Sequence, residues 1–409
     1  MKAKTSLSAR SCGCILLLAA LVLLVPAGLV YLLNPFGADG LDPESGTIYF
    51  VTSHSRRDGV TWSLGAIDGG NRQPRTVWET DNRIESIAWS PDRTRLALAM
   101  YDGAGTWIYL LDIQAATQGD GSALRRISPP AEGLQTPIAD ADPAWSPDGS
   151  RIAFASKRSQ DSASAILVMN ADGSNLRRVS FEPGWSQMCT SHIVPNCLQT
   201  LFGGDTRPAW SPDGSQIAYV GERRGDDRLR QDGSVKDGGI WSEVHVVNAD
   251  GSEDRALVAV EPGIGGPLLW TPDGRRILFS ETGRIGLFAI DLNGSNSTLF
   301  VDNVYGSAPR WSPDGQYLAF EGNHSSIYLV KADGSDKKAL PGCVSPTVND
   351  CVLPTWSADG QHIVYWKQYT SESGEDLLEA ITLQDSDRTR VLCASAWGNG
   401  PLLWLGWAP

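Results

Sequence analysis

The sequence predicts an all-β protein of the β-propeller class, and three observations support this prediction. A tryptophan followed by a tight turn of the Ser-Pro-Asp-Gly type and an alternating apolar segment occurs six times in 409 residues. The copies lie between 41 residues (270 to 311) and 65 residues (145 to 210) apart, the period of propeller blades with variable loops. Glycine (43 residues) and proline (24) are abundant, as is typical of a turn-rich β protein. The repeated tryptophans are Trp89, Trp145, Trp210, Trp270, Trp311 and Trp356.

Each copy has the chemistry of a β-hairpin followed by two further strands. In "SPDG" the proline presets the first turn position, the aspartate accepts from nearby amides and the glycine takes a positive φ. The segment after the turn, such as "RIAF" from Arg151, alternates polar and apolar residues as a strand does. A third strand, "AILVMN" from Ala165, a second turn and a short fourth strand, "NLRRVS" from Asn175, complete the unit. We therefore expect four antiparallel strands in each copy, with the repeated tryptophans packed between neighbouring sheets; sugar stacking is the alternative role for these tryptophans.

The two ends of the repeat region complement each other. The region begins at Gly46 with "GTIYFVTS", which has the pattern of a second strand without a first. The chain ends with "GPLLWLGWAP", which has the pattern of a first strand without successors. Pairing of the C-terminal strand with the N-terminal blade would leave no open sheet edge. The sequence therefore predicts a seven-bladed propeller, with six blades and irregular ends as the alternative.

The repeat unit "AWSPDG-x-x-IAF", followed by "I-x-V-M-N-A-D-G-S", resembles the WD-type repeat of the TolB family of bacterial propellers. The resemblance covers residues 46–409 and implies the propeller fold. It implies no single function, because such propellers serve as protein-docking modules, as gating domains of prolyl oligopeptidase-like enzymes and occasionally as lyases. The family's namesake is a soluble periplasmic protein with a small extra N-terminal domain, whereas this chain has an apolar segment there, which argues against a role in the Tol system.

The N-terminal segment predicts a membrane anchor. A basic tail, residues 1–11, precedes an uncharged apolar run, Cys14 to Leu33, whose length suits a bilayer. Basic residues before the run place the N-terminus in the cytoplasm and the rest of the chain outside. We therefore expect a single transmembrane anchor over residues 12–33, a linker over 34–45 and the propeller over 46–409. A cleaved signal peptide ending at "VPA" (Val25 to Ala27) is the alternative.

The charge of the chain excludes one class of partner. The formal net charge is −13, and the first 38 residues contribute three basic residues and no acidic one. The remainder therefore has 31 basic and 47 acidic residues, a net charge of −16. Nucleic-acid binding needs clustered lysine and arginine, so we expect no nucleic-acid partner.

Two pairs of cysteines predict local disulfides in an oxidising compartment. Cys189 and Cys197 enclose seven residues, as do Cys343 and Cys351, and both pairs lie in loop-like sequence. A zinc site is the alternative at the first pair, but only His192 lies nearby. We therefore expect two disulfides and no metal.

No catalytic or cofactor motif stands out in the sequence. The five histidines are His54, His192, His245, His324 and His362, and no two of them have a metal-ligand spacing. The nucleophile motif G-x-S-x-G is absent, since "GWSQM" fails at its last position. The sequence therefore predicts no catalytic residue and no cofactor.

The candidate binding residues lie at the end of the blades that carries the long loops. Glu85, Asp142 and Arg207 precede repeat tryptophans and are expected near the channel mouth, where they would grip a peptide or cation, or pair with one another between adjacent blades. Trp185 and Trp241 lie in inserted segments and are candidate hot spots for a partner. We therefore expect a non-catalytic binding module or envelope scaffold. The alternative is a carbohydrate-active lyase or hydrolase at the channel mouth, which clustering of His192 and His245 with carboxylates would favour.

Overall fold

The computed structural model describes the greater part of the repeat region. The described residues are 47–56, 59–68, 74–130, 138–158, 163–180, 204–224, 228–229, 235–236, 240–295, 297–304, 309–322, 326–340, 348–357, 359–369, 377–382, 389–394 and 402–408. Within these ranges the regular secondary structure is β-strand apart from one short helix, α3 (Ile113–Thr117). No helix in the described part is long and apolar enough to span a membrane, and the predicted anchor, 12–33, lies outside it.

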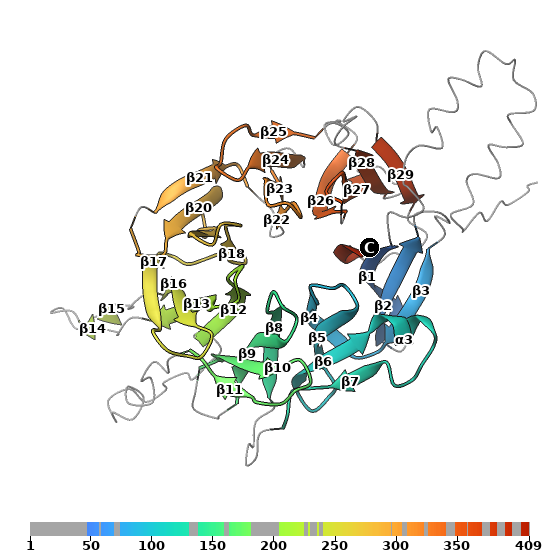
Figure 1. Cartoon of the computed structure of the whole chain (residues 1–409), viewed down its shortest axis with the longest axis horizontal. Coiled ribbons are helices and arrows are strands. Elements are labelled where there is room, and N and C mark those ends of the chain that lie inside the picture. Colours follow the sequence, from blue (N-terminus) through green and yellow to red (C-terminus); the bar gives the residue numbers. More distant parts are fainter. Residues whose placement is uncertain are drawn as a thin grey trace, which may run out of the picture. The chain divides into compact units, whose positions relative to one another are not determined.

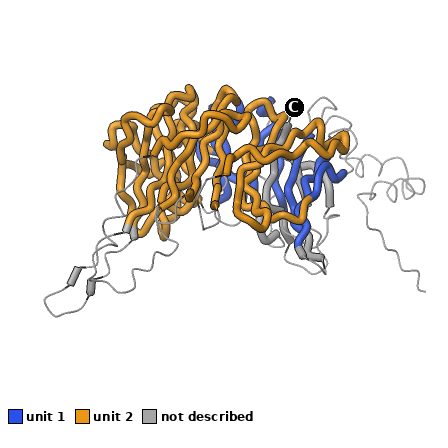
Figure 2. Tube along the Cα trace, turned by 90° about the horizontal axis from the view of Figure 1, so that it is seen from below, with its two compact units in different colours: residues 1–79, 309–329, 336–409 blue, residues 80–308, 330–335 orange. Residues whose placement is uncertain are grey.

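The chain divides into two compact units (Figure 2). Unit 1 comprises residues 1–79, 309–329 and 336–409, and unit 2 comprises residues 80–308 and 330–335. Each unit is built mainly of four-stranded antiparallel sets, and in most of them neighbouring strands follow one another along the chain (Figure 1).

Unit 2 contains four four-stranded sets, each called a sheet here and named by its first and last strands. A parallel bridge between Thr106 and Ala139 joins the first two sets into one eight-stranded sheet. The β4–β7 sheet consists of β4 (Arg83–Trp89), β5 (Arg95–Tyr101), β6 (Thr106–Asp112) and β7 (Leu124–Arg126). The β8–β11 sheet consists of β8 (Ala139–Trp145), β9 (Arg151–Lys157), β10 (Ala165–Asn170) and β11 (Arg177–Arg178). The β12–β17 sheet consists of β12 (Gly204–Trp210), β13 (Gln216–Arg224), β16 (Ile240–Asn248) and β17 (Arg255–Val260), and the β18–β21 sheet of β18 (Leu269–Trp270), β19 (Arg276–Phe279), β20 (Gly286–Asp291) and β21 (Thr298–Asp302). A separate hairpin, β14 (Arg228–Leu229) with β15 (Val235–Lys236), comes between β13 and β16 in sequence.

The other three sheets belong mainly to unit 1. One consists of β22 (Arg310–Trp311), β23 (Tyr317–Glu321), β24 (Ile327–Lys331) and β25 (Lys338–Ala339), and the next of β26 (Val348–Trp356), β27 (His362–Tyr369), β28 (Leu377–Thr382) and β29 (Thr389–Ala394). The third has the order β3-β2-β1-β30, from β3 (Arg75–Thr80), β2 (Gly59–Asp68), β1 (Thr47–Arg56) and β30 (Leu402–Ala408). In it the C-terminal strand pairs antiparallel with the first strand, Thr47 opposite Ala408. The predicted shared sheet is therefore confirmed.

The repeated turn has the geometry that its sequence predicts. In the β8–β9 turn, Gly149 has a φ of +67° and its amide donates to the Ser146 carbonyl at 2.9 Å. The Asp148 carboxylate accepts from the Ser146 hydroxyl at 2.5 Å and from the Ser150 amide at 3.1 Å. These bonds lower the pKa of Asp148 to about 2, the Ser146 hydroxyl contributing most. The turn is thus closed by its own side chains, which fixes the hairpin register.

The repeated tryptophans connect neighbouring sheets. The Trp145 indole N–H donates to the Ala88 carbonyl at 3.1 Å, and the Trp210 indole N–H donates to the Ala144 carbonyl at 3.0 Å. The Arg95 guanidinium lies over the Trp145 ring, 4.8 Å from its centroid. The same bond recurs from Trp270 and from Trp356 to the sheet before each. The predicted packing role is confirmed for these four tryptophans.

Candidate functional site

A row of charged side chains crosses the β12–β17 sheet near the ends of its strands that carry the variable loops. Asp205 of β12 lies opposite Gly221 of β13, and Gly221 lies opposite Glu243 of β16. Arg223 follows Gly221 by two residues and therefore points to the same face, since side chains alternate along a strand. His245, two residues after Glu243, also lies on this face. The antiparallel register thus brings together four residues of three strands, called the charged network here: Asp205, Arg223, Glu243 and His245.

Arg223 joins the two carboxylates of this row. Its Nη1 lies 3.1 Å from Asp205 Oδ1, and its Nε lies 3.2 Å from Glu243 Oε2. The Asp205 side chain is fully buried, and that of Arg223 is 12% exposed. Gly221 makes this arrangement fit, because a Cβ at that position would lie 2.4 Å from Arg223 Nη2. The guanidinium therefore lies flat across the sheet, over the residue that has no side chain.

His245 extends the network toward the outer edge of the sheet. Its Nε2 lies 3.0 Å from Glu243 Oε2, and its Nδ1 lies 3.1 Å from Asp254 Oδ1. Tyr219 stacks on the imidazole with the ring centroids 4.9 Å apart and donates its hydroxyl to Asp254 at 2.6 Å. Burial lowers the pKa of His245, but the hydrogen bonds to Asp254 and Glu243 outweigh burial and the pKa is raised. The site thus favours the charged imidazolium.

This face of the β12–β17 sheet packs against the β8–β11 sheet. Tyr219 and Trp210 lie in one apolar cluster with Ala153, Ala155 and Ile166. Alanines on one side leave room for the large rings on the other, and Tyr219 is fully buried. The charged network is therefore part of an interface between two sheets of unit 2, and its exposed margin lies at the strand ends.

The β8–β11 sheet contains half of the same network, displaced by 65 residues. Asp140 and Arg158 correspond to Asp205 and Arg223 and form an ion pair of 2.7 Å. Ser156 takes the place of Gly221 and bonds to both, donating to Asp140 and accepting from Arg158 Nε at 2.9 Å. Burial raises the pKa of Asp140 and also that of Asp205. The aspartate–arginine pair is thus a repeated device that holds the strand ends.

The other half of the network occurs once in these two sheets. By register, Glu243 and His245 correspond to Ala165 and Leu167 of β10, which are apolar. The sequence signal for this difference is "EVHVV" in β16, where two polar residues two positions apart interrupt an otherwise apolar strand. From the sequence we noted that His245 lacks a metal-ligand spacing and that its clustering with carboxylates would favour an enzyme, but Arg223, Glu243 and Asp254 were not predicted as its neighbours.

The structure brings two of the predicted mouth residues together, but not as an ion pair. The Arg207 backbone amide donates to Asp142 Oδ2 at 3.3 Å. The Arg207 guanidinium donates instead to the carbonyl oxygens of Ile264 and Gly266 at 2.9 and 3.0 Å, and lies 3.5 Å from Glu222. Asp142 lies in a bulge of β8 and Arg207 in the equivalent bulge of β12, with φ values of +51° and +55°. Arg207 therefore fastens the connection that leads into β18.

Glu85 lies apart from this pair. Its carboxylate accepts from Arg83 at 2.9 Å, and the Arg83 side chain is 68% exposed. A surface pair of this kind contributes little to stability. Glu85 thus joins neither Asp142 nor Arg207 in the described contacts.

Trp241 lies at the margin of the charged network. It stands opposite Arg223 in the register of β13 and β16, and its indole N–H donates to Glu243 Oε1 at 3.3 Å. The side chain is half-buried, so part of the ring faces solvent. The second predicted hot spot, Trp185, lies outside the described residues.

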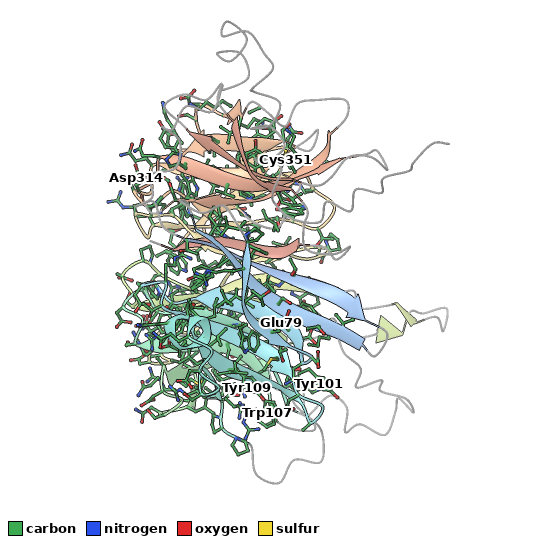
Figure 3. All side chains as sticks on the ribbon, turned by 90° about the vertical axis from the view of Figure 1, so that its right-hand side faces the viewer. Glu79, Tyr101, Trp107, Tyr109, Asp314 and Cys351 are labelled. Atoms are coloured by element: carbon green, nitrogen blue, oxygen red, sulfur yellow. The ribbon has the colours of Figure 1, made fainter. Side chains whose placement is uncertain are left out.

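Of the four cysteines predicted to form disulfides, one lies in the described part of the chain. Cys351 of β26 (labelled in Figure 3) is 1% exposed and disulfide-bonded. Cys343, Cys189 and Cys197 lie outside the described residues, so both pairings remain predictions.

A second group of aromatic residues lies on the β5–β6 hairpin, where Figure 3 labels Tyr101, Trp107 and Tyr109 close together. Tyr109 donates its hydroxyl to Asp102 at 3.0 Å, and burial and this bond raise the pKa of Tyr109 to about 12. The Arg126 guanidinium lies 4.5 Å from the centroid of Trp107. Only Tyr101 is well exposed, at 43%, so this group closes the hairpin rather than forming a cavity.

The described part of the chain has no group of side chains arranged to bind a metal ion. No group of three or more histidine, cysteine, aspartate or glutamate side chains there is arranged to hold an ion. In the charged network the carboxylates instead face Arg223, His245 and Tyr219. The network can therefore hold strands in place and exchange a proton at His245.

Comparisons with known proteins agree with the fold and leave the activity open. No protein-family model matches the chain. An uncharacterized protein of Agrobacterium fabrum is 26% identical over 317 residues, covering 74% of this chain and 90% of its own length. The uncharacterized peptidase YuxL of Bacillus subtilis is 26% identical over 58% of this chain but only 30% of the peptidase. The Tol-Pal system protein TolB of Francisella tularensis is 24% identical over 66% of this chain and 53% of its own length.

Solved structures show the same fold at low identity. A puromycin hydrolase matches with a TM-score of 0.55 and 14% identity, covering 88% of this chain and 55% of the hydrolase. An oligogalacturonate lyase from Vibrio parahaemolyticus matches with a TM-score of 0.50 and 14% identity, covering 85% of this chain and 86% of the lyase. The chain has TolB-like β-propeller relatives. Because these relatives include peptidases and a lyase, the fold alone does not select a function.

Proposed function

We propose that the chain is a non-catalytic propeller that binds a protein or peptide partner, or serves as an envelope scaffold, through the loop end of the β12–β17 sheet. This surface is defined here as Arg207, Glu222 and Trp241. The observation that carries the proposal is the charged network, which holds Trp241 through Glu243. The neighbouring β8–β11 sheet has only part of this network. A half-buried tryptophan held by largely buried charges is a preorganised anchor of the kind that dominates protein interfaces.

The bonding of the network favours binding over catalysis. A general base must reach the proton that it removes, but both ring nitrogens of His245 face carboxylates and its side chain is 12% exposed. Arg223 is shared between Asp205 and Glu243 in the same way. These groups serve to hold the ends of β12, β13 and β16, and with them the side chain of Trp241.

The same site gives a second candidate function some support. We inferred from the sequence that histidines clustered with carboxylates would favour a carbohydrate-active enzyme, and His245 lies between Glu243 and Asp254. The partner histidine of that prediction, His192, lies outside the described residues. An oligogalacturonate lyase in complex with manganese is among the structural neighbours, with a TM-score of 0.51 and 13% identity. Incubating the chain with oligogalacturonate, with and without Mn²⁺, tests this candidate, and product formation lost in His245→Gln would establish it.

The proposal also includes a membrane anchor and a closed propeller. We propose that residues 12–33 anchor the chain in a membrane with the sheets on the extracytoplasmic side, since a basic tail precedes an apolar run. We further propose that the seven sheets are the blades of one closed propeller. The pairing of β30 with β1 supports this, because it completes the one sheet that lacks a first strand of its own in sequence order.

The test is capture of a partner from crosslinked membranes by wild-type chain and by two variants. Trp241→Ala removes the anchor. Arg275→Ala is the control, because Arg275 is an exposed side chain in the β18–β19 turn, at the opposite end of the strands. We expect one partner to be captured by wild type and by Arg275→Ala, and to be lost with Trp241→Ala. Equal capture by all three chains would show that this surface does not bind the partner.

A further inference from the structure

We propose that His245 is a protonation switch that sets how firmly Trp241 is held, so that the binding surface is ordered when the imidazole is charged and loosened when it is neutral. The inference rests on the function proposed for that surface. It is carried by the positions of the hydrogen-bonding groups around the ring.

The charged state of His245 is the one that the two flanking carboxylates require. Nδ1 lies 3.1 Å from Asp254 Oδ1, and Nε2 lies 3.0 Å from Glu243 Oε2. An ionised carboxylate only accepts, so both ring nitrogens must carry a proton to make both bonds. A neutral imidazole has one N–H and can satisfy only one of the two carboxylates.

The neutral state has a partner already in place. Nε2 also lies 3.2 Å from Nη2 of Arg223, which is a donor in every state. If Nδ1 keeps its proton and donates to Asp254, the bare Nε2 can accept from Arg223. Loss of one proton thus transfers a hydrogen bond of the ring from Glu243 to Arg223.

This transfer changes the charge balance of a buried site. Asp205, Glu243 and Asp254 carry three negative charges against the positive charge of Arg223. The imidazolium reduces the excess to one negative charge, and the neutral ring leaves two. Because uncompensated buried charge is costly, the neutral state weakens the arrangement.

The other groups that face His245 do not replace the lost charge. Tyr219 of β13 covers the ring, and its hydroxyl is already donated to Asp254. The facing β8–β11 sheet contributes alanine, isoleucine and valine side chains to the cluster around Tyr219. The two arginines of β11 are bound elsewhere, Arg177 to the Ala249 carbonyl and Arg178 to the Ser180 carbonyl.

Glu243 transmits the change to the surface. Its Oε2 accepts from His245 and Arg223, and its Oε1 accepts from the indole N–H of Trp241. When His245 ceases to donate, Glu243 loses a bond that fixes its carboxylate, and the bond to Trp241 loosens with it. The raised pKa of His245 places this change above pH 6.5, the ordinary value for the group.

The experiment follows Trp241 in the full chain without any partner. The chain is labelled with 5-fluorotryptophan, solubilised in detergent and titrated from pH 5 to pH 9 by ¹⁹F NMR, with Trp241→Phe used to assign the resonance. We expect the Trp241 signal to move through one single-proton transition above pH 6.5, while the signal of Trp145, assigned with Trp145→Phe, stays constant. A Trp241 signal that does not titrate overturns the proposal.

Two variants identify the titrating group. His245→Gln should abolish the transition, and Glu243→Gln should lower its midpoint because one of the two flanking carboxylates is removed. Persistence of the wild-type transition in a folded His245→Gln chain, or an unchanged midpoint in Glu243→Gln, also overturns the proposal. Since no partner is present, this outcome is independent of the capture experiment. Titration without capture would retain the switch and reject the binding function.

Discussion

Gly221→Ala is the sharpest test of the charged network, because the three atoms nearest the added methyl group all belong to the Arg223 side chain. The new Cβ would lie 2.4 Å from Nη2, 2.7 Å from Cζ and 2.7 Å from Nη1 of Arg223. Gly221 has no positive φ, so the backbone itself accepts alanine. The guanidinium must therefore shift, and we expect it to leave its position between Asp205 and Glu243.

The expected cost follows from what Arg223 leaves behind. Asp205 is fully buried, and its ion pair with Arg223 is the charge-neutralising contact at the start of β12. Breaking a buried pair costs about 3–5 kcal/mol, and the 12% exposure of Arg223 places this site at the lower end, about 3 kcal/mol. In a unit of this size each kcal/mol lowers the melting temperature by about 2–4 °C. We therefore expect a decrease of about 6–12 °C.

The assay is thermal unfolding of the full chain by circular dichroism, with Gly121→Ala as the matched control. Gly121 also has an ordinary backbone conformation, and no heavy atom lies within 4 Å of the Cβ that alanine would add there. The control should melt at or slightly above the wild-type temperature, because replacing an unstrained glycine restricts the unfolded chain. If both variants melt together, Arg223 is not confined over Gly221, and the account of the network is wrong.

Two further predictions concern the repeated devices of the sheets. Trp145→Phe keeps an aromatic ring but removes part of the buried indole and its donor to the Ala88 carbonyl, so the free energy of unfolding in urea should fall by at least about 1 kcal/mol; an unchanged value would show that the indole bond is dispensable. Asp148 has a pKa lowered to about 2, chiefly by the Ser146 hydroxyl, so its contribution is complete above the unfolded value of 3.8 and is lost as the pH falls through about 2. An NMR titration of the Asp148 carboxyl should show this midpoint and a higher one in Ser146→Ala, and equal midpoints would contradict the assigned cause.

The fold was predictable because its signals are local and repeated. The turn around Asp148 and Gly149 sets one hairpin, and the same residue types recur in each copy, so every turn is determined by four or five neighbouring residues. The pairing of the first and last strands was also predictable, because a second strand without a first and a first strand without successors complement each other. Each of these inferences needed only the order of patterns along the chain.

The candidate site was less predictable because it depends on register between strands. Arg223, Glu243 and Asp254 are ordinary charged residues in the sequence, and nothing near them indicates that they meet. Their contact requires Gly221 to stand opposite both Asp205 and Glu243, which the pairing of β12, β13 and β16 decides. Arg207 shows the same limit, because its guanidinium binds carbonyl oxygens 57 and 59 residues away rather than the carboxylate that charge alone suggested.

Two equivalent sheets share one pair of charged residues, which serves the fold, and differ in a second pair, which the fold does not require. Both contain the buried aspartate–arginine pair, Asp140 with Arg158 and Asp205 with Arg223, so this pair serves the architecture. Where the β8–β11 sheet has alanine and leucine, the β12–β17 sheet has Glu243 and His245. Apolar residues at these positions satisfy the packing in one sheet, so the fold does not demand the polar pair in the other. A half-buried glutamate and histidine that the architecture does not require must be explained by what they hold, and at the margin of the network Glu243 holds Trp241.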